Sequence, residues 1–130
     1  MLIGQLAIVL EIVLLAALAV FQIAVVAGAP LGAYCWGGKQ VGVLPIRLRI
    51  ASAVSLLLYI AMAGHYASLA GWLPSLLDGQ GRQFVLWGLI VFSLLGVLAN
   101  SFSRSRPERM IFAPVSALLL LGNILILLFQ

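Results

Sequence analysis

Charged side chains are the scarcest class of residue in this chain. Only 8% of its 130 residues are charged, seven of them Lys or Arg and three Asp or Glu. About a quarter of an ordinary soluble domain is charged. Hydrophobic residues make up 65% of the chain and the mean hydropathy is +1.25. This composition is typical of an integral membrane protein.

Cysteine and histidine are also rare. The single cysteine, Cys35, cannot form a disulfide within the chain, so the fold does not depend on a disulfide framework. The single histidine, His65, and the three acidic residues lack the spacing of a metal site. Motifs of serine hydrolases, P-loop proteins and zinc proteases are absent as well. We therefore expect no metal, no cofactor and no catalytic residues, and the sequence favours a protein that is not an enzyme.

Four long apolar runs account for most of the chain. A helix needs about 17 to 25 residues to cross a hydrocarbon core of about 30 Å. The runs are continuous, unlike the alternating strands of a membrane barrel. They predict an all-α integral membrane protein, a four-transmembrane-helix bundle that forms a single domain over residues 1–130. The predicted spans cover residues 2–26, 48–69, 83–101 and 111–129.

The end of the first run carries the small-residue triplet 27–29, which resembles a signal-peptide cleavage site. The run is longer than the apolar region of a signal peptide and contains Glu11. We therefore expect the first run to remain as a membrane span.

The basic residues are distributed unevenly among the three connections, called loop 1, loop 2 and loop 3 in chain order. Loop 2 contains only Arg82. Because cytoplasmic loops are enriched in Lys and Arg, loops 1 and 3 are predicted to face the cytoplasm and both termini the outside. The net charge of +4 then reflects membrane topology, and we expect no nucleic-acid partner. The other six basic residues lie in loops 1 and 3: Lys39, Arg47, Arg49, Arg104, Arg106 and Arg109.

Polar residues inside the spans suggest a second candidate site, because charge within a membrane is costly and is commonly functional. At a rise of 1.5 Å per residue, Glu11, His65 and Asn123 lie about 13, 9 and 10 Å from the outer ends of their spans. If the first two spans pack antiparallel, Glu11 could accept a hydrogen bond from Tyr59 or His65. The predicted intramembrane cluster is Glu11, Tyr59, His65 and Asn123. The alternative is that Glu11 is structural and only joins helices.

Loops 1 and 3 together predict a basic surface rich in glycine. Backbone N–H groups of glycine-rich turns can hold an anion. The simpler interpretation is that the basic residues set the orientation and attract anionic lipids, at about 1 kcal/mol for each residue. The predicted headgroup-binding residues are Gly37, Gly38, Lys39, Arg47, Arg49, Arg104, Arg106 and Arg109.

Two stretches carry a resemblance to a known family. They read "GAPLGAYCWGGKQVGVLPIRLRIASAVS" and, two spans later, "GVLANSFSRSRPERMIFAPVS". The chain resembles a family of uncharacterised four-span bacterial membrane proteins with G-x-P-x-G-x-x-x-W-G-G and N-x-x-S-x-S-x-x-E-R segments. That family commonly has an aromatic residue directly before the proline of the fourth helix, whereas Phe112 here stands one residue earlier. The resemblance covers most of the chain and implies this topology in the bacterial cytoplasmic (inner) membrane, with no assigned activity.

Three functions remain open at this level. The first is an accessory protein that binds a lipid headgroup or a partner through loops 1 and 3. Its partners would be membrane lipids, anionic ones among them, a second copy of the chain or another membrane protein. The second is a small transporter or channel with a site centred on Glu11. The third is a lipid-modifying enzyme, for which only Cys35, Tyr34 and Glu108 are available near the arginines, none with an evident activating group.

Overall fold

Four long helices form the protein, which we describe from a computed structural model covering residues 2–130. Each is long and apolar enough to cross a membrane, and this range contains no strand. The prediction of an all-α, four-helix membrane bundle is therefore confirmed. The long helices are α1 (Leu2–Val26), α2 (Ile46–Leu69), α3 (Gly79–Ser101) and α4 (Arg106–Phe129), and loop 1 contains the short 3₁₀ helices η1 (Gly32–Tyr34) and η2 (Trp36–Gly38).

Three of the helices begin earlier than the apolar runs predict, at residues 46, 79 and 106. Polar caps set two of these starts. The Asp78 side chain accepts a hydrogen bond from the Gly81 N–H (2.6 Å), and Ser105 Oγ accepts one from the Glu108 N–H (3.2 Å). Such caps satisfy N–H groups that have no partner within the helix. An apolar run marks only the part of a helix that lies in hydrocarbon, so it misses these polar first turns.

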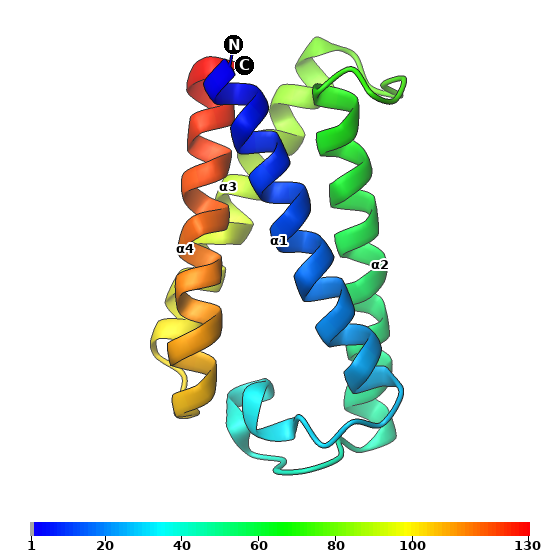
Figure 1. The fold of residues 1–130 in the computed structure, drawn as a ribbon, viewed down its shortest axis with the longest axis vertical. Helices are drawn as coiled ribbons and strands as arrows, with labels where there is room; N and C mark the ends of the chain where they lie inside the picture. The colour runs from blue at the N-terminus through cyan, green and yellow to red at the C-terminus, as the bar shows by residue number, and fades with distance from the viewer. Residues whose placement is uncertain (1) are drawn as a thin grey trace.

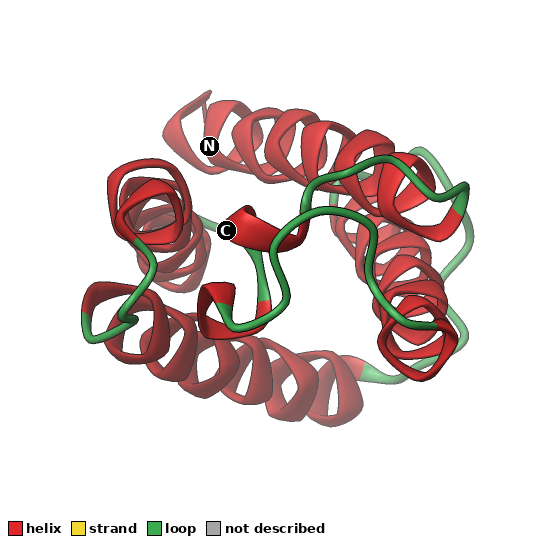
Figure 2. Ribbon diagram, turned by 90° about the horizontal axis from the view of Figure 1, so that it is seen from below, coloured by secondary structure: helices red, strands yellow, loops and turns green. Residues whose placement is uncertain are grey.

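The helices are arranged as two hairpins, α1 with α2 and α3 with α4, which are joined by packing of α1 on α4 (Figure 1). The hairpins are close together at the end that holds both chain termini and diverge toward loop 1. Seen from the loop 1 end, the helices form a ring with η1 and η2 inside it (Figure 2). Loop 1 therefore folds back between the diverging hairpins.

The close crossing of α1 and α4 depends on glycine. A Cβ atom at Gly122 would collide with the Glu11 carboxyl, and one at Gly4 would lie 3.0 Å from the Phe129 carbonyl oxygen. Small residues allow helices in a membrane to approach closely. The Glu11 side chain, which is fully buried, thus occupies the space that a side chain at position 122 would fill.

Gly122→Ala should destabilise the protein by about 1–3 kcal/mol, because the added methyl group overpacks the contact with Glu11. The measurement is the midpoint of thermal unfolding in detergent. Gly88→Ala is the matched control, because no described atom lies within 4 Å of a Cβ atom at Gly88. Adding Glu11→Ala to Gly122→Ala should recover part of the loss. Equal midpoints for Gly122→Ala and Gly88→Ala would contradict the expected overpacking.

Candidate functional site: a cavity and a buried polar network

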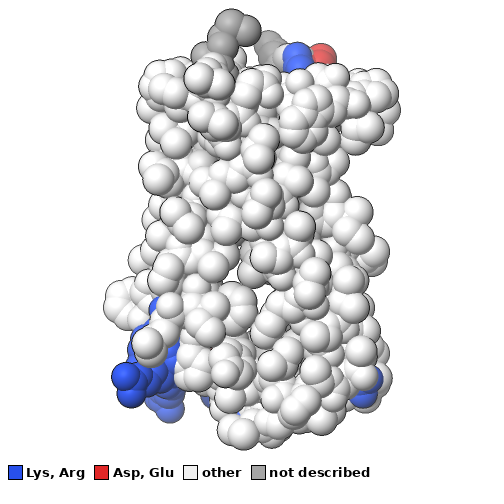
Figure 3. Space-filling view, in the orientation of Figure 1, with Lys and Arg blue, Asp and Glu red and all other residues white. Residues whose placement is uncertain are grey.

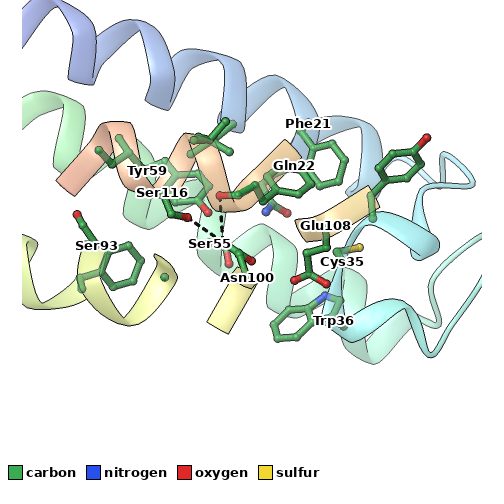
Figure 4. A pocket seen from close by; sticks show the side chains of 17 residues that line it. Phe21, Gln22, Cys35, Trp36, Ser55, Tyr59, Ser93, Asn100, Glu108 and Ser116 are labelled. Carbon is green, nitrogen blue, oxygen red and sulfur yellow. Dashed lines mark hydrogen bonds between the residues drawn. The ribbon is translucent and has the colours of Figure 1, made fainter. Parts of the chain in front are cut away.

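A cavity of about 240 Å³ lies between the two hairpins on the side of loop 1. Figure 4 shows Ser93 at one end of it and Trp36, Cys35 and Glu108 at the other. All four long helices and loop 1 contribute to its wall. The wall combines polar side chains (Gln22, Ser55, Tyr59, Ser93, Asn100, Glu108 and Ser116) with large apolar ones (Leu18, Phe21, Phe92, Phe112, Val115 and Leu119).

The boundary of the cavity differs between its two sides. Between α1 and α4, the rings of Phe21 and Phe112 meet edge to face with centroids 4.9 Å apart, which closes this side. Between α2 and α3, which are joined only by loop 2, the described residues show no comparable helix packing. Phe92 of α3 lines the cavity and is also 47% exposed. Helix packing around the cavity is therefore weakest between α2 and α3.

Polar groups in the cavity wall differ in how far their hydrogen-bonding capacity is used. Asn100 Nδ2 donates to Ser116 Oγ (2.7 Å), which joins α3 to α4. Ser55 Oγ donates only to the Ala51 carbonyl of its own helix (3.2 Å). Gln22 Oε1 is buried and accepts no hydrogen bond from the described residues. Because buried polar atoms normally have a partner, Gln22 is suited to hold the polar group of a ligand.

Loop 1 closes one end of the cavity through an unusual turn. Trp36, Gly37 and Gly38 all have left-handed backbone conformations, with φ of +53°, +73° and +73°. Glycine adopts this conformation without steric cost, which explains the Gly-Gly pair. The turn directs the Gly37 N–H to Glu108 Oε2 (3.1 Å), and Ser103 Oγ donates to the same oxygen (2.8 Å).

A second contact joins loop 1 to the start of α4. Ser105 Oγ donates to the Ala33 carbonyl oxygen. A Cβ atom at Gly38 would lie only 2.9 Å from Ser105 Cβ, so the two segments pack tightly here. Loop 1 and the start of α4 are therefore in direct contact, although Gly37 and Glu108 are 71 positions apart in the chain.

Cys35 lies half-buried at this contact, and its thiol donates to the Leu31 carbonyl oxygen (3.5 Å). Burial, and secondly the nearby negative charge of Glu108, raise the pKa of Cys35 to about 11. The thiolate is the nucleophilic form of cysteine. Cys35 is thus neutral at physiological pH and poorly suited to nucleophilic chemistry.

The predicted headgroup-binding residues do not converge on one point. Figure 3 shows basic atoms at two separated corners of the loop 1 end, one beside the connection from α3 to α4 and one beside the start of α2. Arg104, Arg106 and Arg109 are exposed and lie in the connection from α3 to α4 and the first turn of α4. Arg47 and Arg49 belong to the second corner, since they lie in the first turn of α2.

Several members of that predicted set have structural partners. Arg49 is half-buried and donates from Nε (3.1 Å) and Nη2 (2.7 Å) to the Val26 carbonyl at the end of α1. The Gly37 N–H is directed to Glu108. Arg109 also donates to the Ser103 carbonyl (2.7 Å), although its side chain remains exposed, as does that of Lys39.

A buried polar network lies deeper in the bundle and takes one residue from each long helix. Tyr66 Oη donates to Asn123 Oδ1 (2.5 Å), Asn123 Nδ2 donates to Ser93 Oγ (2.9 Å), and Ser93 Oγ donates to the Leu89 carbonyl (2.7 Å). Glu11 lies beside Tyr66. Neither Glu11 oxygen accepts a hydrogen bond from residues 2–130. Ser93 also lines the cavity, so the network reaches the cavity wall.

The structure places Glu11 and Asn123 in this network but gives Glu11 a different tyrosine neighbour. The hydrogen bond expected from Tyr59 or His65 to Glu11 is not formed, and that prediction is wrong. Tyr59 lines the cavity, and the half-buried His65 has its ring centroid 6.1 Å from that of Tyr66. Successive helical residues point about 100° apart, so positions 65 and 66 cannot both face Glu11.

Tyr66 and Ser93 were absent from the predicted cluster. Tyr66 follows Ser52 and Tyr59 at intervals of seven residues, which is two helical turns and could have identified it from the sequence. Ser93 has no comparable signal, because a serine is common within apolar helices.

Comparison of the chain with protein-family models, with curated proteins and with solved structures finds no match among any of them. The function proposed below therefore rests on the geometry of the cavity and of the polar network.

Labelling of Cys35 by a maleimide should be roughly ten- to a hundredfold slower than that of an exposed cysteine at mildly alkaline pH, because little thiolate forms below its raised pKa. The reference is Leu76→Cys in a Cys35→Ser background, since Leu76 is 99% exposed. The rate at Cys35 should go on rising by about tenfold per pH unit after the reference levels off. Parallel pH profiles for the two cysteines would contradict this expectation.

Proposed function

We propose that the protein binds the polar headgroup of a membrane lipid in the cavity between its two hairpins. The observation that carries this proposal is the mixed cavity wall, in which the unpartnered Gln22 Oε1 lies among serine, tyrosine and phenylalanine side chains. At about 240 Å³ the cavity is smaller than most drug-sized ligand sites. This size suits a headgroup whose acyl chains leave toward the bilayer between α2 and α3.

Anionic lipids are the preferred class. Arg104, Arg106 and Arg109 lie exposed beside the start of α4, the helix that also carries Glu108 of the cavity wall. Each basic residue near an anionic membrane surface contributes about 1 kcal/mol of attraction. Loop 1, held by Glu108 and Ser105, separates the cavity from the aqueous phase on this side. The lipid would then enter sideways from the bilayer.

The proposed location is the bacterial cytoplasmic membrane, with loops 1 and 3 in the cytoplasm and both termini outside. Six of the seven basic residues belong to the loop 1 end of the bundle. In Figure 3, basic atoms gather at this end, and the opposite end shows one small basic and acidic pair. The rule that cytoplasmic loops are the basic ones supports this orientation.

Ser55→Leu should displace the lipid, because leucine projects into the cavity while only a bond to the same helix is lost. Native mass spectrometry of protein taken from vesicles of phosphatidylglycerol and phosphatidylethanolamine should show bound lipid in the wild type. We expect at least about a tenfold lower bound fraction in Ser55→Leu, the effect of about 1.4 kcal/mol.

Ser68→Leu is the matched control. Ser68 also lies in α2 and donates only to a carbonyl of its own helix, that of His65 (2.7 Å), but it does not line the cavity. Arg104→Ala and Arg106→Ala should reduce the preference for phosphatidylglycerol. Equal lipid occupancy in Ser55→Leu and Ser68→Leu would rule out the cavity as the binding site.

The orientation has its own test, with single cysteines placed in a Cys35→Ser background. A membrane-impermeant maleimide added to intact cells should label Leu76→Cys in loop 2 and spare Arg104→Cys in loop 3. Both positions are exposed, so solvent accessibility does not separate them. After the cells are permeabilised, both should react. Labelling of Arg104→Cys alone in intact cells would reverse the proposed topology.

A further inference from the structure

The Glu11 carboxyl occupies a position that does not suit a charged group. It is fully buried within α1, and neither of its oxygens accepts a hydrogen bond from residues 2–130. Burying an ionised carboxylate without a partner is far more costly than burying a neutral carboxylic acid. The surroundings therefore favour the form of Glu11 that carries a proton.

The hydrogen bonds beside Glu11 fit the same form. The single hydrogen of the Tyr66 hydroxyl is directed to Asn123 Oδ1 (2.5 Å). While its hydrogen is used by Asn123, Tyr66 Oη can only accept a further hydrogen bond, so in this arrangement a bond between Tyr66 and the neighbouring Glu11 requires the carboxyl to donate. A carboxyl group donates only when it is protonated. With that proton in place, hydrogens are donated in one direction from Glu11 through Tyr66, Asn123 and Ser93.

The space around the carboxyl admits a proton and little else. Glu11 packs directly on the backbone of Gly122, and it lines neither the cavity on the side of loop 1 nor the one at the end that holds the termini. Facing it are Tyr66 from α2 and Gly122 from α4, and beyond Tyr66 lie Asn123 of α4 and the Ser93 hydroxyl of α3. The titratable groups on this side are Tyr66 and then His65, whose ring centroid is 6.1 Å from that of Tyr66.

We propose that Glu11 is a proton-binding site whose occupancy is transmitted to the cavity wall through Tyr66, Asn123 and Ser93. When the proton leaves for aqueous solution, the carboxylate becomes an acceptor and draws the Tyr66 hydrogen to itself. Asn123 Oδ1 then loses its donor, and the amide that donates to Ser93 is free to turn. Because Glu11 is fully buried, the exchange requires the hairpins to move apart.

The same hydrogen-bonded network couples proton binding at Glu11 to ligand binding in the cavity. Ser93 Oγ lines the cavity, so a ligand bonded there and a proton on Glu11 change each other's affinity by the same factor. This coupling rests on the proposed lipid-binding function. The proton site itself does not, and its test uses protein freed of lipid, so the two proposals can fail separately.

The experiment is infrared spectroscopy of the lipid-free protein at neutral pH. It should show the carbonyl band of a protonated carboxylic acid, shifted in deuterated water. The chain has only three acidic side chains, so the band can be assigned by substitution. It should persist in the double variant Asp78→Asn, Glu108→Gln and be lost in Glu11→Gln. A spectrum without this band, or a band that survives Glu11→Gln, overturns the proposal.

The frequency of the same infrared band tests whether the protonation state of Glu11 is transmitted to the cavity wall. Tyr66→Phe removes the acceptor and should shift the band to higher frequency, and Ser93→Ala should shift it by less in either direction. Ser116→Ala is the matched control, because Ser116 lines the cavity but bonds to Asn100, outside the network. If the band frequency is the same in Ser93→Ala as in Ser116→Ala, the network does not transmit the protonation state of Glu11 to the cavity wall. If Glu11→Gln fails to fold, the band shift in Tyr66→Phe decides the assignment.

Discussion

The contact between the Glu11 carboxyl and the bare backbone of Gly122 is the constraint on which the rest of the bundle depends. It brings α1 and α4 together in the half that holds the chain termini. A larger residue at 122, or an ionised Glu11, would oppose this approach. Because the hairpins meet there, they diverge on the other side, and the divergence creates the cavity. Stability and the candidate site therefore have one origin.

Loop 1 occupies the space that this divergence leaves. Irregular backbone is costly where it meets lipid, since its N–H and C=O groups need partners. Here the partners come from the start of α4: Glu108 accepts from the Gly37 N–H, and Ser105 donates to the Ala33 carbonyl. The left-handed Trp-Gly-Gly turn makes the first of these contacts geometrically accessible. Loop 1, whose basic residues indicate membrane orientation in the sequence, is thus part of the cavity wall.

The polar network separates two cavities. The second, also about 240 Å³, lies at the end that holds the termini and is lined by Arg82, Gln83 and Gln130 among others. On α4, Leu119 lines the first cavity and Ile126 the second, with Asn123 between them. A transporter centred on Glu11, the alternative function, would have to open this layer to either side by moving the hairpins. In the described structure the layer is packed, which is the arrangement expected of a binding protein or of a closed state.

The sequence by itself determined the number of spans, their helical form, and the presence of Glu11 and Asn123 inside them, because hydropathy and the cost of buried charge are properties of single segments. It also placed the basic residues at one end. Only the tertiary structure decided that Tyr66 rather than Tyr59 or His65 faces Glu11, that Ser93 completes the network, and that the arginines occupy two corners. These features depend on the rotation of each helix about its axis and on the divergence of the hairpins. Both are set by packing between segments, and no single segment encodes them.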